Sequence, residues 1–383
     1  MKSRMIQTMG GALTLAIMTG CGGSNQGYTS PNNTAPATPV LSQLHTVTTI
    51  GSTVDATNGD SNPYGLMVAP ITAGYVTAGD LVVCNFNDVN GVQGNGTTIE
   101  DLAPTAGAAP KRIAQDPSLK GCAALSPNPA NGYIWAAAYT ANDNPIFTPS
   151  GKLVSTLGSN YSWMNPWGEI YASPESTSAS TGSSYGYGTS STSSTSWYVS
   201  DAKNGSIVQV AVTASGMVYN TIATGFPVNL ASQFGVLAPA GLSYNPTSDT
   251  LYIVSSASNS VVAFKAVSTI PANGITVTEN TTTMALSFTG PNASQASVVY
   301  SGAPLNYPVS SAILYNGNLV VGNTGDNNMV EIDPVQQKMV GEKLVDPGNA
   351  GAIFGIATTG SSAATQKIYF NDDNANSVVA VSQ

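Results

Sequence analysis

Short runs of β-prone residues recur along the chain, and each run ends in a small or polar residue. Successive runs start 53, 63, 54, 68 and 49 residues apart, and the six are Leu81–Asn85, Ile134–Ala138, Trp197–Asp201, Leu251–Ser255, Leu319–Asn323 and Ile368–Asp372. Regular recurrence at a period of this size is typical of radial or stacked repeat architectures. The pattern predicts an all-β protein built from similar units.

Each unit is predicted to hold two further strands, and we name the three strands a, b and c in chain order, with the recurring run as b. Strand c follows b after a turn of Asn, Asp, Gly and Ser in four copies, at Ile207–Val210, Val261–Phe264, Met329–Ile332 and Val378–Val381. Strand a opens after a turn rich in Pro and Gly, at Asn62–Leu66, Asn165–Glu169, Ala238–Leu242 and Ile353–Ile356. Glycine at the start of strand a lets backbones approach closely, as the strands nearest a central axis must.

These motifs carry a resemblance to a known class of repeat. The segments Asn62-Pro63-Tyr64-Gly65-Leu66, Leu251–Ser255 and Asn259–Phe264 resemble NHL-type and YVTN-type propeller repeats, and the resemblance covers residues 44–383. It implies a single β-propeller of six four-stranded blades. Seven blades are the alternative if residues 264–306 hide one, since 274–278 and 284–288 read as strands, although these could also elaborate an outer strand.

The two ends of the repeat region are expected to pair. The chain ends just after strand c of the sixth copy, which therefore lacks a fourth strand, while residues 44–51 form a β-prone run with no partner of their own. Pairing this run with residues 377–382 would close the ring and remove open strand edges. Residues 173–196, a stretch of Ser, Thr and Gly between strands a and b of copy three, are expected to form a mobile loop.

The N-terminus reads as an export signal. Lys2 and Arg4 precede an apolar stretch that is too short to anchor a protein across a bilayer. Met18-Thr19-Gly20-Cys21 resembles the bacterial lipobox, with Met18 where Leu is usual. We therefore predict a signal peptide over 1–20, lipidation of Cys21, a flexible tether over 21–43, and a place in the cell envelope, in the periplasm or at the cell surface. An ordinary cleaved signal peptide is the alternative.

The amino-acid composition limits the classes of partner that the protein could bind. Only 8% of residues are charged, with 11 basic and 20 acidic side chains. Removal of residues 1–20 would take away Lys2 and Arg4, which leaves 9 basic and 20 acidic side chains and a net charge of −11. Because the chain has no cluster of Arg or Lys, it lacks the electrostatic footprint of a nucleic-acid-binding protein.

Few residues could perform nucleophilic or metal chemistry. His45 is the only histidine, which argues against a Ser-His-Asp triad and excludes a site built from several histidines. Neither a CxxC pair nor a GxxxxGK phosphate loop occurs. Cys84 and Cys122 are a candidate disulfide if the protein is exported to an oxidising compartment, and two buried thiols are the alternative.

The most polar positions lie in the turns between strands b and c. In a propeller these b–c turns share one face with the turns that lead into strand a, so their oxygen atoms could converge on Ca²⁺ or Mg²⁺. The candidate ligand-binding residues are Asn85, Asp88, Asn142, Asp201, Asn323, Asp326 and Asp372. The alternative is that these side chains only cap tight turns, as Asn and Asp do in any β-protein.

Glu169 is the one acid at the start of a strand a, and it completes the candidate set. Its position resembles that of an inward ligand in regucalcin- and gluconolactonase-like propellers. Tyr64, Trp167, Tyr307 and Phe354 stand at the turns leading into strands, where they could stack on a sugar or peptide or wedge blades together.

Three functions fit these features. The first is a lipid-anchored binding scaffold for a protein, peptide or glycan. The second is a Ca²⁺- or Mg²⁺-dependent hydrolase or lactonase, as the gluconolactonase resemblance implies. The third is a structural envelope protein without a ligand.

The lipobox yields a direct prediction. Cys21→Ser removes the thiol that would carry the lipid, so the variant is expected to move from the membrane fraction to the soluble fraction. Fractionation followed by immunoblotting measures this shift. If the variant stays with the membranes as the unaltered protein does, Cys21 is not the anchor.

Overall fold

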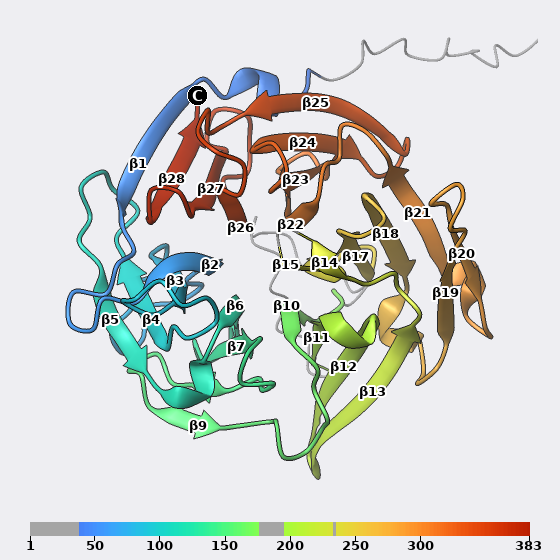
Figure 1. Cartoon of the computed structure of the whole chain (residues 1–383), viewed down its shortest axis with the longest axis horizontal. Coiled ribbons are helices and arrows are strands. Elements are labelled where there is room, and N and C mark those ends of the chain that lie inside the picture. The colour runs from blue at the N-terminus through green and yellow to red at the C-terminus, as the bar shows by residue number, and fades with distance from the viewer. Residues whose placement is uncertain (1–37, 176–194, 233–234) are drawn as a thin grey trace, which may run out of the picture. The chain divides into compact units, whose positions relative to one another are not determined.

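The computed structural model describes residues 38–175, 195–232 and 235–383. Six blades of four strands each are arranged radially around one axis, and two further strands extend one of them, which makes the protein a six-bladed β-propeller and confirms the predicted fold (Figure 1). Within the described ranges, no helix has the length and apolar character needed to cross a membrane. The expected signal peptide, Cys21 and most of the expected tether lie outside the described residues.

In every blade the innermost strand is a, followed outward by b, c and a fourth strand. Blade 1 comprises β2 (Ser61–Val68), β3 (Leu81–Asn87), β4 (Thr98–Leu102) and β5 (Lys111–Gln115). Blade 2 comprises β6 (Cys122–Pro127), β7 (Ile134–Ala138), β8 (Ile146–Phe147) and β9 (Leu153–Ser155). Blade 3 begins with β10 (Pro166–Ala172), β11 (Ser196–Asp201), β12 (Ser206–Thr213) and β13 (Gly216–Thr224).

The remaining blades follow the same order. Blade 4 comprises β16 (Pro239–Asn245), β17 (Thr250–Ser255), β18 (Ser260–Lys265) and β21 (Ala296–Ser301). Blade 5 comprises β22 (Pro308–Ile313), β23 (Leu319–Asn323), β24 (Asn328–Asp333) and β25 (Lys338–Leu344). Blade 6 comprises β26 (Ile353–Thr359), β27 (Lys367–Asp372), β28 (Ser377–Ser382) and β1 (Thr46–Ser52).

Short elements occupy the connections between these strands. A small hairpin, β14 (Asn229–Ser232) and β15 (Gly235–Leu237), lies between blades 3 and 4 in the chain. The 3-10 turns are η1 (Leu41–Gln43), η2 (Pro117–Leu119), η3 (Ala202–Asn204), η4 (Val267–Thr269) and η5 (Ala293–Gln295).

The ring closes through the N-terminus, as predicted. Strand β1 pairs antiparallel with β28, from Thr46 opposite Ser382 to Ser52 opposite Ser377, and lies beside it at the rim (Figure 1). The N–H of His45 extends this ladder by donating to the carbonyl of Ser382. The outer edge of blade 6 therefore comes from the opposite end of the chain.

The long stretch after Phe264 forms no seventh blade. Besides β21, which is the fourth strand of blade 4, this stretch holds the hairpin of β19 (Ile275–Glu279) and β20 (Leu286–Thr289), and β19 pairs parallel with β13 of blade 3. The side chains of Ile275 and Val277 are buried with Ile222 and Phe226 in one apolar cluster. The insertion therefore lengthens blade 3 at its outer edge, and we refer to β19 and β20 as the strap.

Two expected boundaries require correction. Val40 and Leu41, placed in the flexible tether over 21–43, are buried with Leu44 and Met329, and the Leu41 N–H donates to Glu331 Oε2 at 2.9 Å. Because both side chains are apolar, they pack against blade 5, so the propeller begins before residue 44. At the far end of the expected loop over 173–196, Ser196 begins β11 and pairs with Ala172; residues 176–194 lie outside the described part.

The inner strands touch one another through glycine. Every inner strand shifts register just after its start, the mark of a β-bulge. A Cβ on Gly168 would lie 2.1 Å from the carbonyl oxygen of Ala240, and one on Gly355 would lie 2.5 Å from that of Tyr64. These positions exclude a side chain because the backbone of the next blade occupies the space.

Four of the six joints between blades share a hydrogen bond from a turn asparagine, which we call the asparagine latch. The asparagine lies in a b–c turn with positive φ, a conformation that Asn tolerates better than most residues. Its Oδ1 accepts a backbone N–H at the start of strand a of the next blade or just before it. The pairs are Asn142 with Asn165, Asn259 with Tyr307, Asn327 with Gly351 and Ala352, and Asn376 with Asn62.

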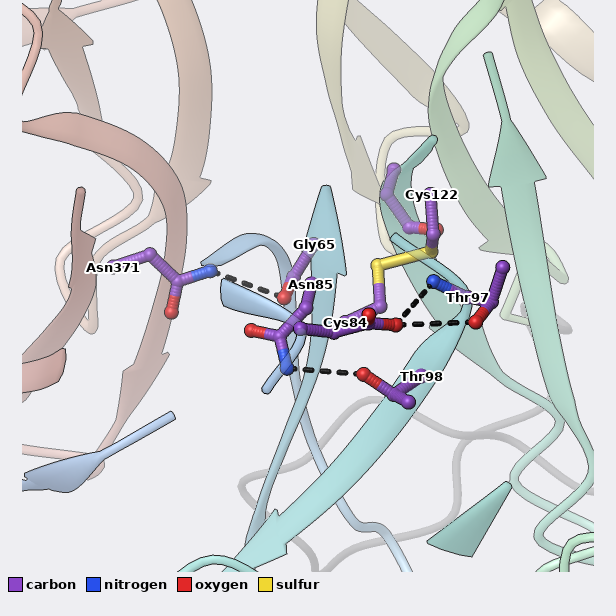
Figure 2. The surroundings of a disulfide bond; sticks show 9 residues. Gly65, Cys84, Asn85, Thr97, Thr98, Cys122 and Asn371 are labelled. Atoms are coloured by element: carbon purple, nitrogen blue, oxygen red, sulfur yellow. Dashed lines mark hydrogen bonds between the residues drawn. A yellow bond between two sulfur atoms is a disulfide. The ribbon is translucent and has the colours of Figure 1, made fainter. Parts of the chain in front are cut away.

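The other two joints are fastened differently. Between blades 1 and 2, Cys84 and Cys122 form a disulfide with their Cα atoms 5.9 Å apart (Figure 2). Between blades 3 and 4, the chain of blade 4 supplies the strap that pairs with blade 3. Figure 2 also shows Asn371 of blade 6 donating from Nδ2 to the carbonyl of Gly65 in blade 1. Every joint thus has a fastening beyond apolar packing.

The latch predicts a graded loss of stability. Asn376→Ala removes the hydrogen bond and places alanine at positive φ, so the free energy of unfolding should fall by about 2 kcal/mol. Asn376→Gly keeps the backbone conformation and should cost about 1 kcal/mol. Urea unfolding followed by fluorescence measures both.

Asn273 provides the control, because it also has positive φ but lies outside the latches. Asn273→Ala should therefore lose only the stability that alanine costs at positive φ, without the further loss of a latch hydrogen bond. Equal losses for Asn376→Ala and Asn273→Ala would show that the latch hydrogen bond contributes nothing.

Candidate functional site

The six inner strands enclose a cavity along the propeller axis. Its volume is about 770 Å³, and its lining comes from β2, β6, β10, β16, β22 and β26 with the loops that follow some of them. Most lining side chains are apolar, among them Leu66, Leu125, Ile170, Leu242 and Ile356. This cavity, with walls from all six blades, is a candidate for a ligand site.

Aromatic rings cap one end of the cavity. The ring of Tyr64 stacks on Phe354 with centroids 3.7 Å apart and on Phe86 with centroids 4.1 Å apart, and Trp167 and Tyr139 complete the group. Burial raises the pKa of Tyr64 far above its usual value. The rings come from blades 1, 2, 3 and 6, so this aromatic cap wedges those blades together and covers the cavity on the face of the b–c turns.

Tyr307, grouped with these rings in the sequence, is not part of the cap. Its backbone N–H instead completes the latch with Asn259.

The other end of the cavity reaches the opposite face, formed by the loops between strands a and b. The lining there includes Pro70, Ile71, Pro129 and Tyr244, all half-exposed. We call this end the mouth. A ligand would enter here, on the face opposite to the one that the sequence favoured.

Backbone groups contribute much of the polar character of the cavity wall. Each inner strand is the terminal strand of its sheet, so one of its edges has no partner strand. Such an edge presents N–H and C=O groups in alternation. Six of these edges surround the axis, which gives the wall both donors and acceptors.

Glu169 lies in β10 but is enclosed rather than solvated. Its side chain is 4% exposed, and neither carboxyl oxygen has a hydrogen-bond partner. It stands opposite Val199, which packs with Trp135 in the joint between blades 2 and 3, so the carboxyl shares an apolar environment. Burial raises the pKa of Glu169 well above its usual value, which favours the neutral form. The expected inward ligand is therefore an enclosed acid without a hydrogen-bond partner.

The acids of the b–c turns satisfy backbone and amide donors in their own turns and in the segments that lead into strand a. Asp88 accepts from the N–H groups of Asn90 and Val92. Asp201 accepts from the Met164 N–H and from Asn204 Nδ2, and burial raises its pKa to about 6.

The two later acids do the same. Asp326 accepts from Asn323 Nδ2, Asn306 Nδ2 and the Asn328 N–H. Asp372 accepts from the Ala375 N–H, and burial is the main cause that raises its pKa. These contacts are those of turn caps.

The amides of the candidate set are also engaged. Asn85 donates to Thr98 Oγ1 (Figure 2) and to the carbonyl of Thr53, and Asn323 donates to the carbonyl of Pro304. Asn142 forms a latch. Across the described ranges, no three His, Cys, Asp or Glu side chains gather as a metal site. The structure therefore distributes the candidate residues over separate turns instead of bringing them together around Ca²⁺ or Mg²⁺.

A buried carboxyl network in blade 1 had no counterpart in the sequence prediction. Asp55, in the turn after β1, forms an ion pair with Arg112 of β5. Burial tends to raise the pKa of Asp55, but hydrogen bonds from Arg112, Glu100 and two backbone N–H groups outweigh it and lower the pKa well below the usual range. Burial and the nearby Asp55 raise the pKa of Glu100 to about 9.

Asp101, next to Glu100 in β4, meets Asp80 on the other side of the strand. Burial and Asp80 raise the pKa of Asp101 to about 7. The sequence signal for this network is the pair of adjacent acids in a short β-prone run. Charged residues are rarely buried without a partner, so two of them in a strand indicate an interacting group.

Comparison with known proteins identifies only the fold. No protein family and no curated protein matches the chain. A putative gluconolactonase of known structure has a TM-score of 0.53 and 10% identity over 90% of this chain and 96% of its own. The gluconolactonase XC5397 from Xanthomonas campestris has a TM-score of 0.53 and 9% identity over 84% of this chain and 86% of its own. Virginiamycin B lyase from Staphylococcus aureus has a TM-score of 0.48 and 13% identity over 88% of this chain and 99% of its own.

The carboxyl network in blade 1 predicts that replacing one of its acids increases the stability of the fold, by an amount that depends on pH. Glu100 binds its proton more tightly in the folded protein, with a pKa of about 9 against 4.5 when unfolded. Stability from this group is therefore fully present below about pH 4.5 and is lost as the pH rises toward 9. Glu100→Gln should be more stable than the unaltered protein by about 2–4 kcal/mol near pH 8 and by much less near pH 5.

Chemical denaturation at the two pH values measures this gain. Glu342→Gln, at an exposed position in β25, is the matched control and should change little. A gain from Glu100→Gln of the same size at both pH values would contradict the raised pKa.

Proposed function

We propose that this protein is an exported, lipid-anchored binding protein whose ligand occupies the central cavity. The observation that carries the proposal is the cavity itself: about 770 Å³, capped at one end by stacked rings and, among the described residues, reaching the face of the a–b loops at the other. Ligand pockets of small molecules commonly measure about 300–1,000 Å³ and are mostly apolar with a few polar groups.

The size of the cavity limits the ligand. It accepts a small molecule, or the end of a peptide or glycan, and is too small for a folded partner protein. Because the walls are strands of a closed ring, the site exists before the ligand arrives. Binding then requires little ordering of the protein, which favours affinity.

The hydrolase or lactonase alternative has less support. Metal-dependent hydrolysis needs several hard oxygen ligands that converge on one ion. Glu169 is the only Asp or Glu in the cavity lining, and its carboxyl is enclosed without a partner. The likeness to gluconolactonases, at about one-tenth identity, extends to the fold alone.

Membrane attachment is the second part of the proposal and rests on sequence. Cys21 follows a short apolar segment, and residues 21–39 would separate a lipid from the packed propeller that begins near Val40.

The test is to fill the cavity. Ala312 lies half-exposed in the wall, so Ala312→Trp should occlude the site, whereas Ala285→Trp places the same ring at an exposed position on the strap turn. Ligands found by a thermal-shift screen of a small-molecule library are expected to lose their effect with Ala312→Trp and keep it with Ala285→Trp.

A variant with Asp201, Asp326 and Asp372 all changed to Ala separates the two faces. If ligands, including Ca²⁺, lose their effect in this variant and keep it in Ala312→Trp, the site lies in the b–c turns and the cavity proposal is wrong.

A further inference from the structure

We infer that the cavity selects uncharged, apolar peptides or similar amides and excludes ligands with a net charge. This inference deepens the proposed function and rests on it. Three features of the wall support it. The lining residues offer no accessible charge, the inner strands each have an edge without a partner strand, and the rings of the aromatic cap stack on one another.

The wall has no accessible charged group that could pair with a charged ligand. Among the lining residues, Glu169 is the only one with a carboxyl or basic group, and both of its oxygens are buried without a partner. The remaining lining side chains are apolar, hydroxyl-bearing or glycine. A charged ligand that left water for this cavity would lose its hydration and gain no opposite charge, so its binding would be weaker than that of an uncharged ligand.

The inner strands already hydrogen-bond to groups outside their ladders. Four of their carbonyl oxygens accept from side chains of a neighbouring blade. The pairs are Gly65 with Asn371, Ala240 with Ser200, Pro308 with Ser256, and Ile313 with Thr358. Backbone carbonyls of these strands therefore accept amide and hydroxyl donors where the fold supplies them.

An amide ligand matches such a wall. A strand edge presents donors and acceptors alternately, and a peptide backbone presents the same groups at a similar spacing, which is the basis of recognition by strand addition. Apolar side chains such as Leu66, Leu125, Ile170 and Leu242 line the same space. The ligand that satisfies both is a short peptide with apolar side chains and blocked or absent charges.

A sugar fits this wall less well. Sugar sites use the free face of an aromatic ring, but here the faces of Tyr64 are covered by Phe354 and Phe86. The lining also lacks Asn, Gln, Asp and Arg side chains, which commonly bind several hydroxyl groups of one sugar. The observations therefore favour a peptide over a glycan.

Three matched dipeptides test this inference with the purified full chain. N-acetyl-leucyl-leucinamide is uncharged, leucyl-leucinamide is a cation, and N-acetyl-leucyl-leucine is an anion. Saturation-transfer NMR and calorimetric titration should show the uncharged peptide binding at least about ten-fold more tightly than either charged one. Ala312→Trp should abolish that binding, and Ala285→Trp should leave it unchanged.

Equal or tighter binding of a charged dipeptide would overturn the inference, as would tighter binding of the uncharged sugar maltotriose. If no dipeptide binds but library ligands still respond to Ala312→Trp, the ligand class is wrong and the cavity site stands. If no ligand responds to Ala312→Trp, the proposed function itself fails.

Discussion

Contact between the backbones of neighbouring inner strands is the constraint on which the rest of this structure depends. Six strands surround one axis only if each comes close to the next, and at Gly168 and Gly355 that approach leaves no room for a Cβ. The bulge at the start of every inner strand sets the direction in which the chain enters the crowded centre. The same closeness keeps the strand edges turned toward the axis, where they line the cavity. Fold and candidate site are thus two results of one packing requirement.

The joints show how a repeat protein tolerates irregular copies. Four joints use an asparagine at positive φ to accept an N–H from the next blade. The two joints without this latch are fastened by other means. Blade 1 has a longer b–c turn and is linked to blade 2 by the disulfide, whereas blade 3 is paired with the strap from blade 4. Neighbouring blades are therefore joined by a covalent bond, by a side-chain hydrogen bond or by a pair of strands, depending on the joint.

The sequence predicted the fold better than the site, for a physical reason. Blade strands repeat a pattern of apolar residues because each must be covered on both faces, and that pattern is visible in one sequence. Polar turn residues such as Asp88 and Asn142 are equally conspicuous, but the structure uses their oxygens for turns and latches. The cavity wall is made of backbone edges and small residues such as Ala124 and Ala312, which carry no chemical signal. Glu169 stood out by type, yet its burial depends on Val199 and on blade 2, which only the folded ring brings near.

A cavity walled by backbone has consequences for both specificity and stability. Its polar groups cannot be removed by substitution, so selectivity is set by which small side chains line it and by how firmly the blades are held. A ligand on the axis would touch strands from several blades at once and would therefore favour the closed ring over any state in which a joint has opened. The fastenings at the rim and the ligand at the centre would then stabilise the same arrangement. This linkage gives each joint, although it is remote from the cavity, an influence on ligand affinity.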